Sequence, residues 1–210
     1  MTSPQPPAES TTAQRVFRSS GGMVGGALLL VLTAWIVVDA VVQGEGRTPW
    51  LALAAALLLL PLIVMLTLRP AVFVDDERIR IRNPFRTITL PWAAVADVRA
   101  GYSSELFTET GKKYQLWAIP VSLRQRKSAA RRQTRAAIDD PHGTTSVHAD
   151  VADAKARMAP ADRTIADLRE LAERHAAQPG SPGEPQIRWA YELLAPAAAG
   201  AVLLAVLLAV

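Results

Sequence analysis

The stretch VDDERIRIRNPFRTITLPWAAVADVRA, residues 74–100, decides the fold of the polar half of the chain. Its apolar residues alternate first with arginines and then with threonines, which is typical of β-strands with one buried face. The acidic turn DDE at 75–77 separates this stretch from AVFV at 71–74, so the sequence predicts a hairpin there. The residues predicted to face the interior of these strands are Ile79, Ile81, Ile88 and Leu90.

Two further strand-like runs follow this stretch. YSSELFTE at 102–109 and KYQLWAIPV at 113–121 flank the turn TGK and predict a second hairpin. In total we expect five to seven strands between residues 71 and 123, and their closely spaced turns indicate an antiparallel sandwich or barrel. The run DRTIADLRELAERHAA at 162–177 predicts an amphipathic helix that closes the sheet.

The order of these elements resembles the bacterial PH domain of the low molecular weight protein antigen 6 type. In that family an acidic or polar turn leads into an arginine-containing strand, and a later strand runs into a P-W-x-x-V-x-x-V element. The residues that carry this element here are Leu90, Pro91, Trp92, Val95 and Val98. The resemblance covers 70–123 and, loosely, the later helix, and it implies a bent seven-stranded sandwich with a C-terminal helix over one open end. It also implies that Trp92, Val95 and Val98 are core residues rather than ligand contacts.

Three apolar segments are long enough to cross a membrane as helices. They are residues 21–42, 49–68 and 189–210. At 1.5 Å per residue, a helix of about 20 residues spans the ~30 Å hydrocarbon core. The short turn between the first two segments makes them a helical hairpin, and Pro61 is expected to kink the second. The third segment is the weaker candidate because it is rich in alanine.

Asp39 interrupts the first span three residues from the end of the apolar run. We interpret it as an interfacial acid in contact with water, because a carboxylate costs less there than at the bilayer centre. A buried ion or proton site is the alternative.

Small residues recur every four positions in the first and third spans. This spacing lets helix backbones approach closely in lipid, so helix–helix self-association is one hypothesis. The other is that alanine is simply common in this chain. The residues concerned are Gly21, Gly22, Gly25, Gly26, Ala197, Ala201, Ala205 and Ala209.

Basic residues beside the spans predict the orientation. Arg15 and Arg18 precede the first span and five arginines follow the second within 20 residues, whereas the hairpin turn holds one Arg and one Glu. The positive-inside rule therefore places the N-terminus and residues 69–188 on the cytoplasmic side of the cell membrane, and the C-terminus outside. We expect 1–20 to be a disordered tail and 179–188 to be a linker.

The arginines of the 78–82 strand follow closely on the second span. Anionic headgroups attract nearby basic residues by about 1 kcal/mol each, so Arg78, Arg80 and Arg82 are candidates for contact with the inner leaflet. A solvated outer face is the alternative. Eukaryotic PH domains that bind phosphoinositides commonly carry Lys and Arg around their first hairpin loop, but the acidic turn 75–77 would repel a phosphate. We therefore do not expect that activity here.

The run RQRKSAARRQTR at 124–135 carries six basic residues and no acid. It is the stronger candidate for binding headgroups or an unidentified protein partner, and the alternative is a flexible solvated loop. Nucleic acid is not an expected partner, because the run lacks interleaved aromatic residues. The candidate binding residues are Arg124, Arg126, Lys127, Arg131, Arg132 and Arg135.

This run opens an insertion, 124–160, in a domain that we place at 70–178. Members of the family that the domain resembles often combine it with two helices. The insertion and the third span therefore depart from the simplest pattern of that family.

No catalytic arrangement is evident in the sequence. The chain has no cysteine, which excludes disulfides, cysteine nucleophiles and thiolate metal sites. His142 and His148 share a loop with four aspartates, but the spacing typical of metal ligands is missing, so we predict neither a metal nor a cofactor. TGKK lacks the glycines of a P-loop, and hydrolase and zincin motifs are missing.

Together these features predict a membrane protein of mixed architecture, with apolar helices and a PH-like β domain, that binds rather than catalyses. Its expected partners are the anionic headgroups of the bilayer and a protein. The alternative is a small subunit of a transport or cell-envelope complex, in which the helices act and the domain regulates them. Only in that alternative would Asp39 matter for function.

Overall fold

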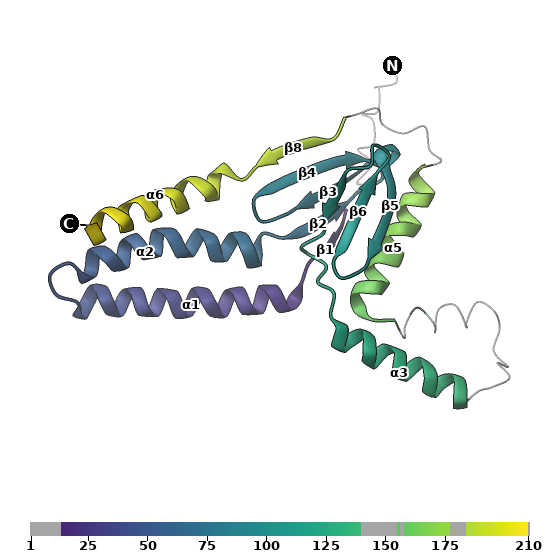
Figure 1. Cartoon of the computed structure of the whole chain (residues 1–210), viewed down its shortest axis with the longest axis horizontal. Helices are drawn as coiled ribbons and strands as arrows, with labels where there is room; N and C mark the ends of the chain where they lie inside the picture. The colour runs from purple at the N-terminus through teal and green to yellow at the C-terminus, as the bar shows by residue number, and fades with distance from the viewer. Residues whose placement is uncertain (1–13, 140–154, 156–157, 177–183, 210) are drawn as a thin grey trace, which may run out of the picture.

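The computed structural model describes residues 14–139, 155, 158–176 and 184–209, which form a bundle of apolar helices and a domain at one end of it (Figure 1). The helices of the bundle are α1 (Ser20–Gln43), α2 (Thr48–Ile63) and α6 (Tyr191–Ala209). The α1–α2 turn and the end of α6 both lie at the far end from the domain (Figure 1). There Arg47 donates a hydrogen bond to the carbonyl of Leu207, which joins the turn to α6.

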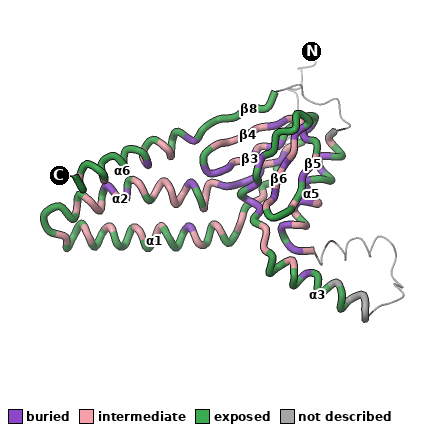
Figure 2. Tube along the Cα trace, viewed as in Figure 1, coloured by how far each residue is buried: buried purple, intermediate pink, exposed green. Residues whose placement is uncertain are grey.

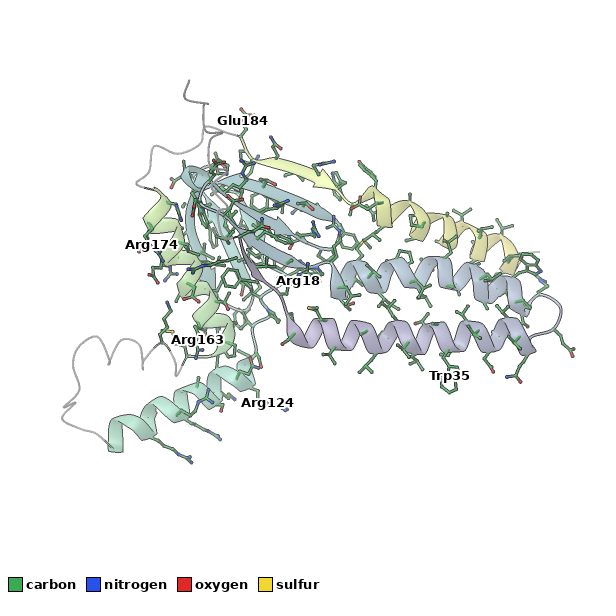
Figure 3. The ribbon with its side chains drawn as sticks, turned by 180° about the vertical axis from the view of Figure 1, so that it is seen from behind. Arg18, Trp35, Arg124, Arg163, Arg174 and Glu184 are labelled. Carbon is green, nitrogen blue, oxygen red and sulfur yellow. The ribbon has the colours of Figure 1, made fainter. Side chains whose placement is uncertain are left out.

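All three helices are long and apolar enough to cross a membrane, as the sequence predicts. After Pro61, α2 continues as the π-helical turn η1 (Val64–Leu68), so the second span runs from Thr48 to Leu68. A proline inside a helix removes one N–H and disturbs the regular hydrogen bonds, which accounts for the wider turn. Trp35 on α1 is 70% exposed and points away from the bundle, as a lipid-facing side chain would (Figure 3).

Glycines allow the second span, formed by α2 and η1, to lie close to both neighbouring helices. A Cβ atom on Gly26 of α1 would lie 2.7 Å from the Cβ of Thr67, and one on Gly200 of α6 would lie 2.7 Å from the carbonyl carbon of Leu57. Real Cβ atoms do not approach so closely, so both contacts require glycine. Of the alanine repeat on α6, only the first member, Ala197, is buried. Its later members are exposed.

Within the described residues, the domain contains two antiparallel sheets (Figure 1). The five-stranded sheet has the order β1-β2-β3-β4-β8 and the three-stranded sheet the order β5-β6-β7. The strands are β1 (Arg15–Phe17), β2 (Ala71–Val74), β3 (Arg78–Arg82), β4 (Arg86–Pro91), β5 (Val95–Ala100), β6 (Ser104–Thr108), β7 (Lys113–Gln115) and β8 (Gln186–Trp189). The predicted combination of apolar helices with a sheet domain is therefore confirmed.

The core of the domain lies where the sheets face α5 (Pro160–Ala176), which packs over β5 and the short helix η2 (Trp92–Ala94). Figure 2 shows buried residues concentrated in the domain, while the helical bundle is mostly exposed or intermediate. Ile165, Leu168 and Leu171 of α5 pack against the apolar residues of the strands and complete the core. The predicted interior residues all belong to this core, namely Ile79, Ile81, Ile88, Leu90, Trp92, Val95 and Val98.

Two segments that we expected to be irregular contain strands. β1 lies within the expected tail and pairs with β2, and β8 begins within the expected linker, ends at the first residue of the expected third span and pairs with β4. Each has only three or four residues, too few for alternation to reveal it, and each is stabilised by hydrogen bonds to a distant strand. Most of the remaining tail, insertion and linker lies outside the described residues, at 1–13, 140–154, 156–157 and 177–183. His142 and His148 belong to this part of the insertion.

Trp92 connects the first hairpin to α5. Its Nε1 donates a 2.8 Å hydrogen bond to the carbonyl of Asp75, and its ring stacks on His175 with 5.6 Å between centroids. The Asp75 carboxylate accepts hydrogen bonds from the N–H groups of Glu77 and Arg78, at 3.1 and 2.8 Å. An aspartate that caps its own turn in this way gives the acidic sequence of the turn a structural role.

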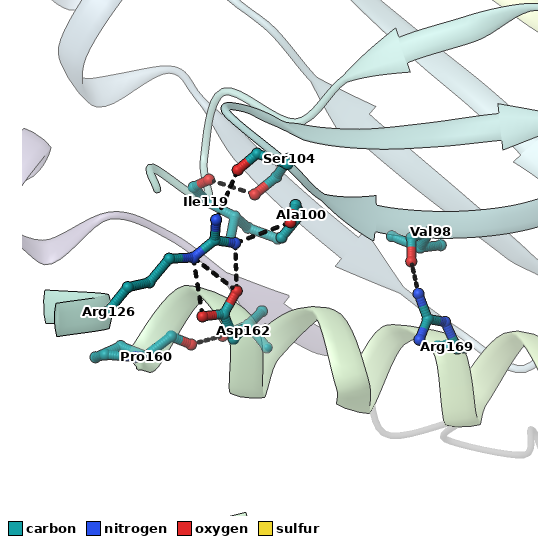
Figure 4. A network of polar contacts seen from close by, with 10 residues as sticks. Val98, Ala100, Ser104, Ile119, Arg126, Pro160, Asp162 and Arg169 are labelled. Carbon is teal, nitrogen blue, oxygen red and sulfur yellow. Dashed lines mark hydrogen bonds and ion pairs between the residues drawn. The ribbon is translucent and has the colours of Figure 1, made fainter. Parts of the chain in front are cut away.

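Asp97 joins β5 to α5. Arg169 lies 3.3 Å from its carboxylate and donates a 2.8 Å hydrogen bond to the carbonyl of Val98 (Figure 4). Burial acts to raise the pKa of Asp97, but hydrogen bonds from Arg99 and from the Val98 N–H, with the charge of Arg169, outweigh it and lower the pKa. A lowered carboxyl pKa stabilises the folded state above the unfolded value of about 4, and this stabilisation disappears as the pH falls through the folded value.

We therefore expect Asp97→Asn to melt below the parent protein at about pH 6, and the difference to shrink toward about pH 3. Melts of the full-length protein in detergent, followed by circular dichroism, measure both values. A difference that stays constant over this range would show that the charge of Asp97 does not contribute to stability.

Candidate functional site

Three strands of the five-stranded sheet continue directly into the three spans. β1 ends three residues before α1 begins at Ser20, β2 begins three residues after η1 ends at Leu68, and β8 ends two residues before α6 begins at Tyr191. Connections this short keep the sheet at the ends of the helices. An arginine lies at each junction, and these arginines are Arg18, Arg69 and Arg188.

The outer face of this sheet, which points away from the core, carries further arginines in rows set by the strand register. The row nearest the spans is Ala71, Arg82, Thr87 and Arg188. The next row is Phe73, Arg80, Thr89 and Gln186. Arginines from different strands are therefore side by side close to the ends of the apolar helices.

Three guanidinium groups gather around the ring of Phe73. The Cζ atoms of Arg18, Arg80 and Arg82 lie 5.9, 5.3 and 5.1 Å from the ring centroid. Arg80 Nε is buried and has no hydrogen-bond partner among the described residues. Burial and the neighbouring arginines together lower the pKa of Arg82. This cluster is therefore a concentration of positive charge that the protein only partly compensates.

Arg69 ties the domain to the third span. Its Nη1 donates a 2.5 Å hydrogen bond to the carbonyl of Asn83, and its Nη2 lies 3.3 Å from both Thr87 Oγ1 and Glu192 Oε1. The Arg69 side chain is 9% exposed, whereas that of Glu192 is 67% exposed. Asn83 in turn donates a 2.8 Å hydrogen bond to the carbonyl of Gln115, which connects the two sheets.

The arginines of this face line a groove of about 1440 Å³ between the outer face of the sheet, η1 and the start of α6, which we call the junction groove. Val64, Leu68 and Leu193 line it where it meets the spans. The acidic turn 75–77 lines it where β2 ends, away from the spans. The arginines that line the groove are Arg18, Arg69, Arg78, Arg80, Arg82 and Arg188.

The structure separates the three candidate arginines of β3. Arg80 and Arg82 belong to the cluster around Phe73. Arg78 instead donates a 2.8 Å hydrogen bond to Glu77, and this contact raises the pKa of Arg78 although burial acts against it. The junction arginines that sequence reasoning did not assign to a site are Arg18, Arg69 and Arg188. The sequence signal that could have identified them is that each lies next to a different apolar span.

The basic run forms α3 (Leu123–Asp139), which projects from the domain away from the helical bundle (Figure 1). Arg126, predicted to be a surface binding residue, instead forms hydrogen bonds to other residues of the domain. Its Nε donates to the Asp162 carboxylate at 3.0 Å, and its Nη2 donates to the carbonyl of Ala100 at 2.9 Å (Figure 4). The exposed basic residues of α3 are Arg124, Lys127, Arg131, Arg132 and Arg135.

Residues 69–180, which contain β2 to β7 and α5, match the family described as bacterial PH domain. The match covers 112 of the 210 residues. The chain belongs to the bacterial PH domain family. The resemblance predicted from the sequence is therefore confirmed. No curated protein and no solved structure gives a significant match.

The PH domain is extended by elements outside the matched residues. β1 and β8 lie at the two edges of its first sheet, and both lead into spans. The junction groove is therefore built jointly by the PH domain and the segments that connect it to the apolar helices. PH domains are generally non-catalytic modules that bind lipids or proteins. Among the described residues, no group of three or more histidines and acids is placed to hold a metal ion.

Proposed function

We propose that this protein holds a PH domain at the cytoplasmic face of the cell membrane, where the domain binds a protein partner and the inner leaflet without catalysing a reaction. The observation that carries this proposal is the continuity of one sheet with three spans. Because β1, β2 and β8 are each joined to a helix within three residues, the domain presents its surfaces at a fixed height and orientation. Fixed presentation suits a binding module.

α3 supports the protein-partner part of this proposal. The helix exposes five basic residues and points away from the spans, so it is placed for an acidic protein surface rather than for headgroups (Figure 1). The hydrogen bonds of Arg126 to Asp162 and Ala100 fix the start of the helix relative to the PH domain. We therefore assign the partner to α3 and the leaflet to the junction groove, which lies beside the spans.

Charge reversal on α3 should weaken capture of the partner. A photo-crosslinking residue at the exposed position Gln125 would be used in native membranes, with and without Arg124→Glu plus Arg131→Glu. Because opposite charges across an interface favour association, we expect the yield of a defined crosslinked protein to fall about tenfold. The control is Lys112→Glu plus Lys113→Glu, in the β6–β7 turn and at the first residue of β7, which makes the same change in charge elsewhere. Equal loss in both variants would argue against an interface on α3.

The orientation can be tested with single cysteines, because the natural chain has none. We expect Glu45→Cys, in the exposed α1–α2 turn, to react with a membrane-impermeant maleimide in intact cells. Lys112→Cys, in the PH domain, should react only after the membrane is permeabilised. The reverse pattern would place the PH domain outside the cell.

The alternative in which the helices act receives no support from Asp39. Its carboxylate accepts a hydrogen bond from Gln43, at the end of α1, and it is exposed beside the turn that follows. This position fits an acid at the bilayer surface, and we do not propose a transport role for it.

A further inference from the structure

The junction groove combines the two chemical surfaces that a phospholipid needs. We propose that it binds the phosphate of an anionic phospholipid, whose acyl chains lie against η1 and the start of α6. This inference adds a ligand to the proposed function. It rests on that function only for the position of the PH domain at a membrane surface.

The height of the arginines above the hydrocarbon core fits a headgroup. The second span ends at Leu68, and Ala71 follows three residues later. Arg82 lies opposite Ala71 in the sheet. An extended chain rises about 3.3 Å per residue, so Arg82 lies at most about 10 Å beyond the end of the span. The headgroup layer occupies roughly 5–8 Å on each side of the hydrocarbon core. The long side chains of this row therefore reach into that layer.

Six arginines line the groove against four carboxylates, those of Asp75, Asp76, Glu77 and Glu192, so its lining carries an excess of positive charge that favours an anion. Glu192 pairs with Arg69 and Glu77 pairs with Arg78. No carboxylate among the described residues forms an ion pair with the other arginines of the groove, which are Arg18, Arg80, Arg82 and Arg188. Buried positive charge is costly without a counter-charge, and the buried Nε of Arg80 is a donor without an acceptor.

Arginine is also the side chain best suited to a phosphate. Its planar guanidinium group donates two parallel hydrogen bonds to the oxygens of one phosphate, which a lysine cannot do. All six basic residues that line the groove are arginines. They come from β3, from β8 and from the segments next to α1 and α2, so one phosphate bound among them would be contacted from several directions.

A soluble phosphate compound would use the same arginines, but the groove contains more than a polar surface. Val64, Leu68 and Leu193 line it where it meets the spans. A small polar ligand would leave these side chains against water, whereas the acyl chains of a lipid would cover them. Basic pockets at the cytoplasmic ends of membrane helices are known to bind lipid headgroups in other proteins.

The test titrates the full-length protein in detergent with phosphatidylglycerol and, in parallel, with phosphatidylcholine, which has the same phosphate but no net charge. Native mass spectrometry counts the lipids bound. We expect phosphatidylglycerol to bind at least about tenfold more tightly. Arg82→Gln plus Arg188→Gln should weaken its binding about 30-fold, the effect of removing two charges near a headgroup.

Two control variants make this result specific. Arg131→Gln plus Arg135→Gln removes the same charge from the exposed face of α3 and should leave the affinity unchanged. Arg82→Lys plus Arg188→Lys keeps the charge, and it should keep more affinity than the glutamine variant if the groove is folded and charged as described. A melting curve for each variant identifies any that has lost its fold.

Equal binding of the two lipids, or equal loss of affinity in the α3 control, would overturn the proposal. Displacement of phosphatidylglycerol by millimolar inorganic phosphate would assign the groove to a soluble phosphate compound and overturn the lipid part. The capture experiment on α3 is independent of this titration. Failure to find a protein partner is therefore distinguishable from failure of the groove to bind lipid.

Discussion

Replacing Trp92 with alanine should remove the contact between the first hairpin and α5, and it should destabilise the PH domain more than any other single truncation of its core. The side chain is 2% exposed, donates a hydrogen bond to the carbonyl of Asp75 and stacks on His175. Buried tryptophan-to-alanine changes cost about 3–5 kcal/mol, a large part of the roughly 5–15 kcal/mol that stabilises a typical domain. Urea unfolding of the full-length protein in detergent measures the loss.

Trp35→Ala is the matched control for this experiment. Trp35 is 70% exposed on α1 and lies far from the PH domain core, so its removal should change the stability of that domain by no more than about 0.5 kcal/mol (Figure 3). Trp92→Phe should lie between the two, because it keeps an aromatic ring and loses the hydrogen bond. If Trp92→Ala unfolded at the same urea concentration as Trp35→Ala, Trp92 would not be the connection described here.

Replacing Gly200 with leucine should separate α6 from α2. A Cβ atom at this position would lie 2.7 Å from the carbonyl carbon of Leu57, which is backbone and cannot rotate aside. Overpacked interiors typically cost about 1–3 kcal/mol, and a backbone clash is expected at the upper end or beyond. Because β8 leads into α6 within two residues, the displacement should also weaken the pairing of β8 with β4. Thermal unfolding and hydrogen exchange at Ile187 measure the two effects.

Ala201→Leu provides the comparison, since Ala201 is the next residue along α6 and is exposed. It adds the same side-chain type to the lipid-facing surface, where there is room for it, and it should leave both measurements close to those of the parent protein. Equal effects of the two substitutions would show that leucine itself, and not the close approach of α6 to α2, causes the loss.

Local sequence patterns identify the spans and the first hairpins because their signals are contained within short stretches. Alternation places Ile79 and Ile81 on the buried face of β3, and an uninterrupted apolar run identifies α2. The P-W-x-x-V element, with Trp92 and Val95, indicates the family from five residues. Each of these predictions depends on residues that are close together in the chain.

The remaining features depend on pairings between distant segments. β1 pairs with β2 across the whole helical hairpin, and β8 pairs with β4 from about 100 residues away. The junction groove needs Arg18, Arg82 and Arg188 together, and no local pattern brings these three residues side by side. Composition likewise could not distinguish Arg126, held by Asp162, from the exposed basic residues of α3.

Because β1, β2 and β8 are joined directly to helices, we expect the sheet to be sensitive to the thickness of a surrounding bilayer. Transmembrane helices adjust to a thicker or thinner hydrocarbon layer by tilting. Only Ala190 separates β8 from α6, so a tilt of α6 relative to α2 must bend the outermost strand or shear its hydrogen bonds to β4. We therefore expect the composition of the surrounding lipid to exert a mechanical load on the sheet of the PH domain.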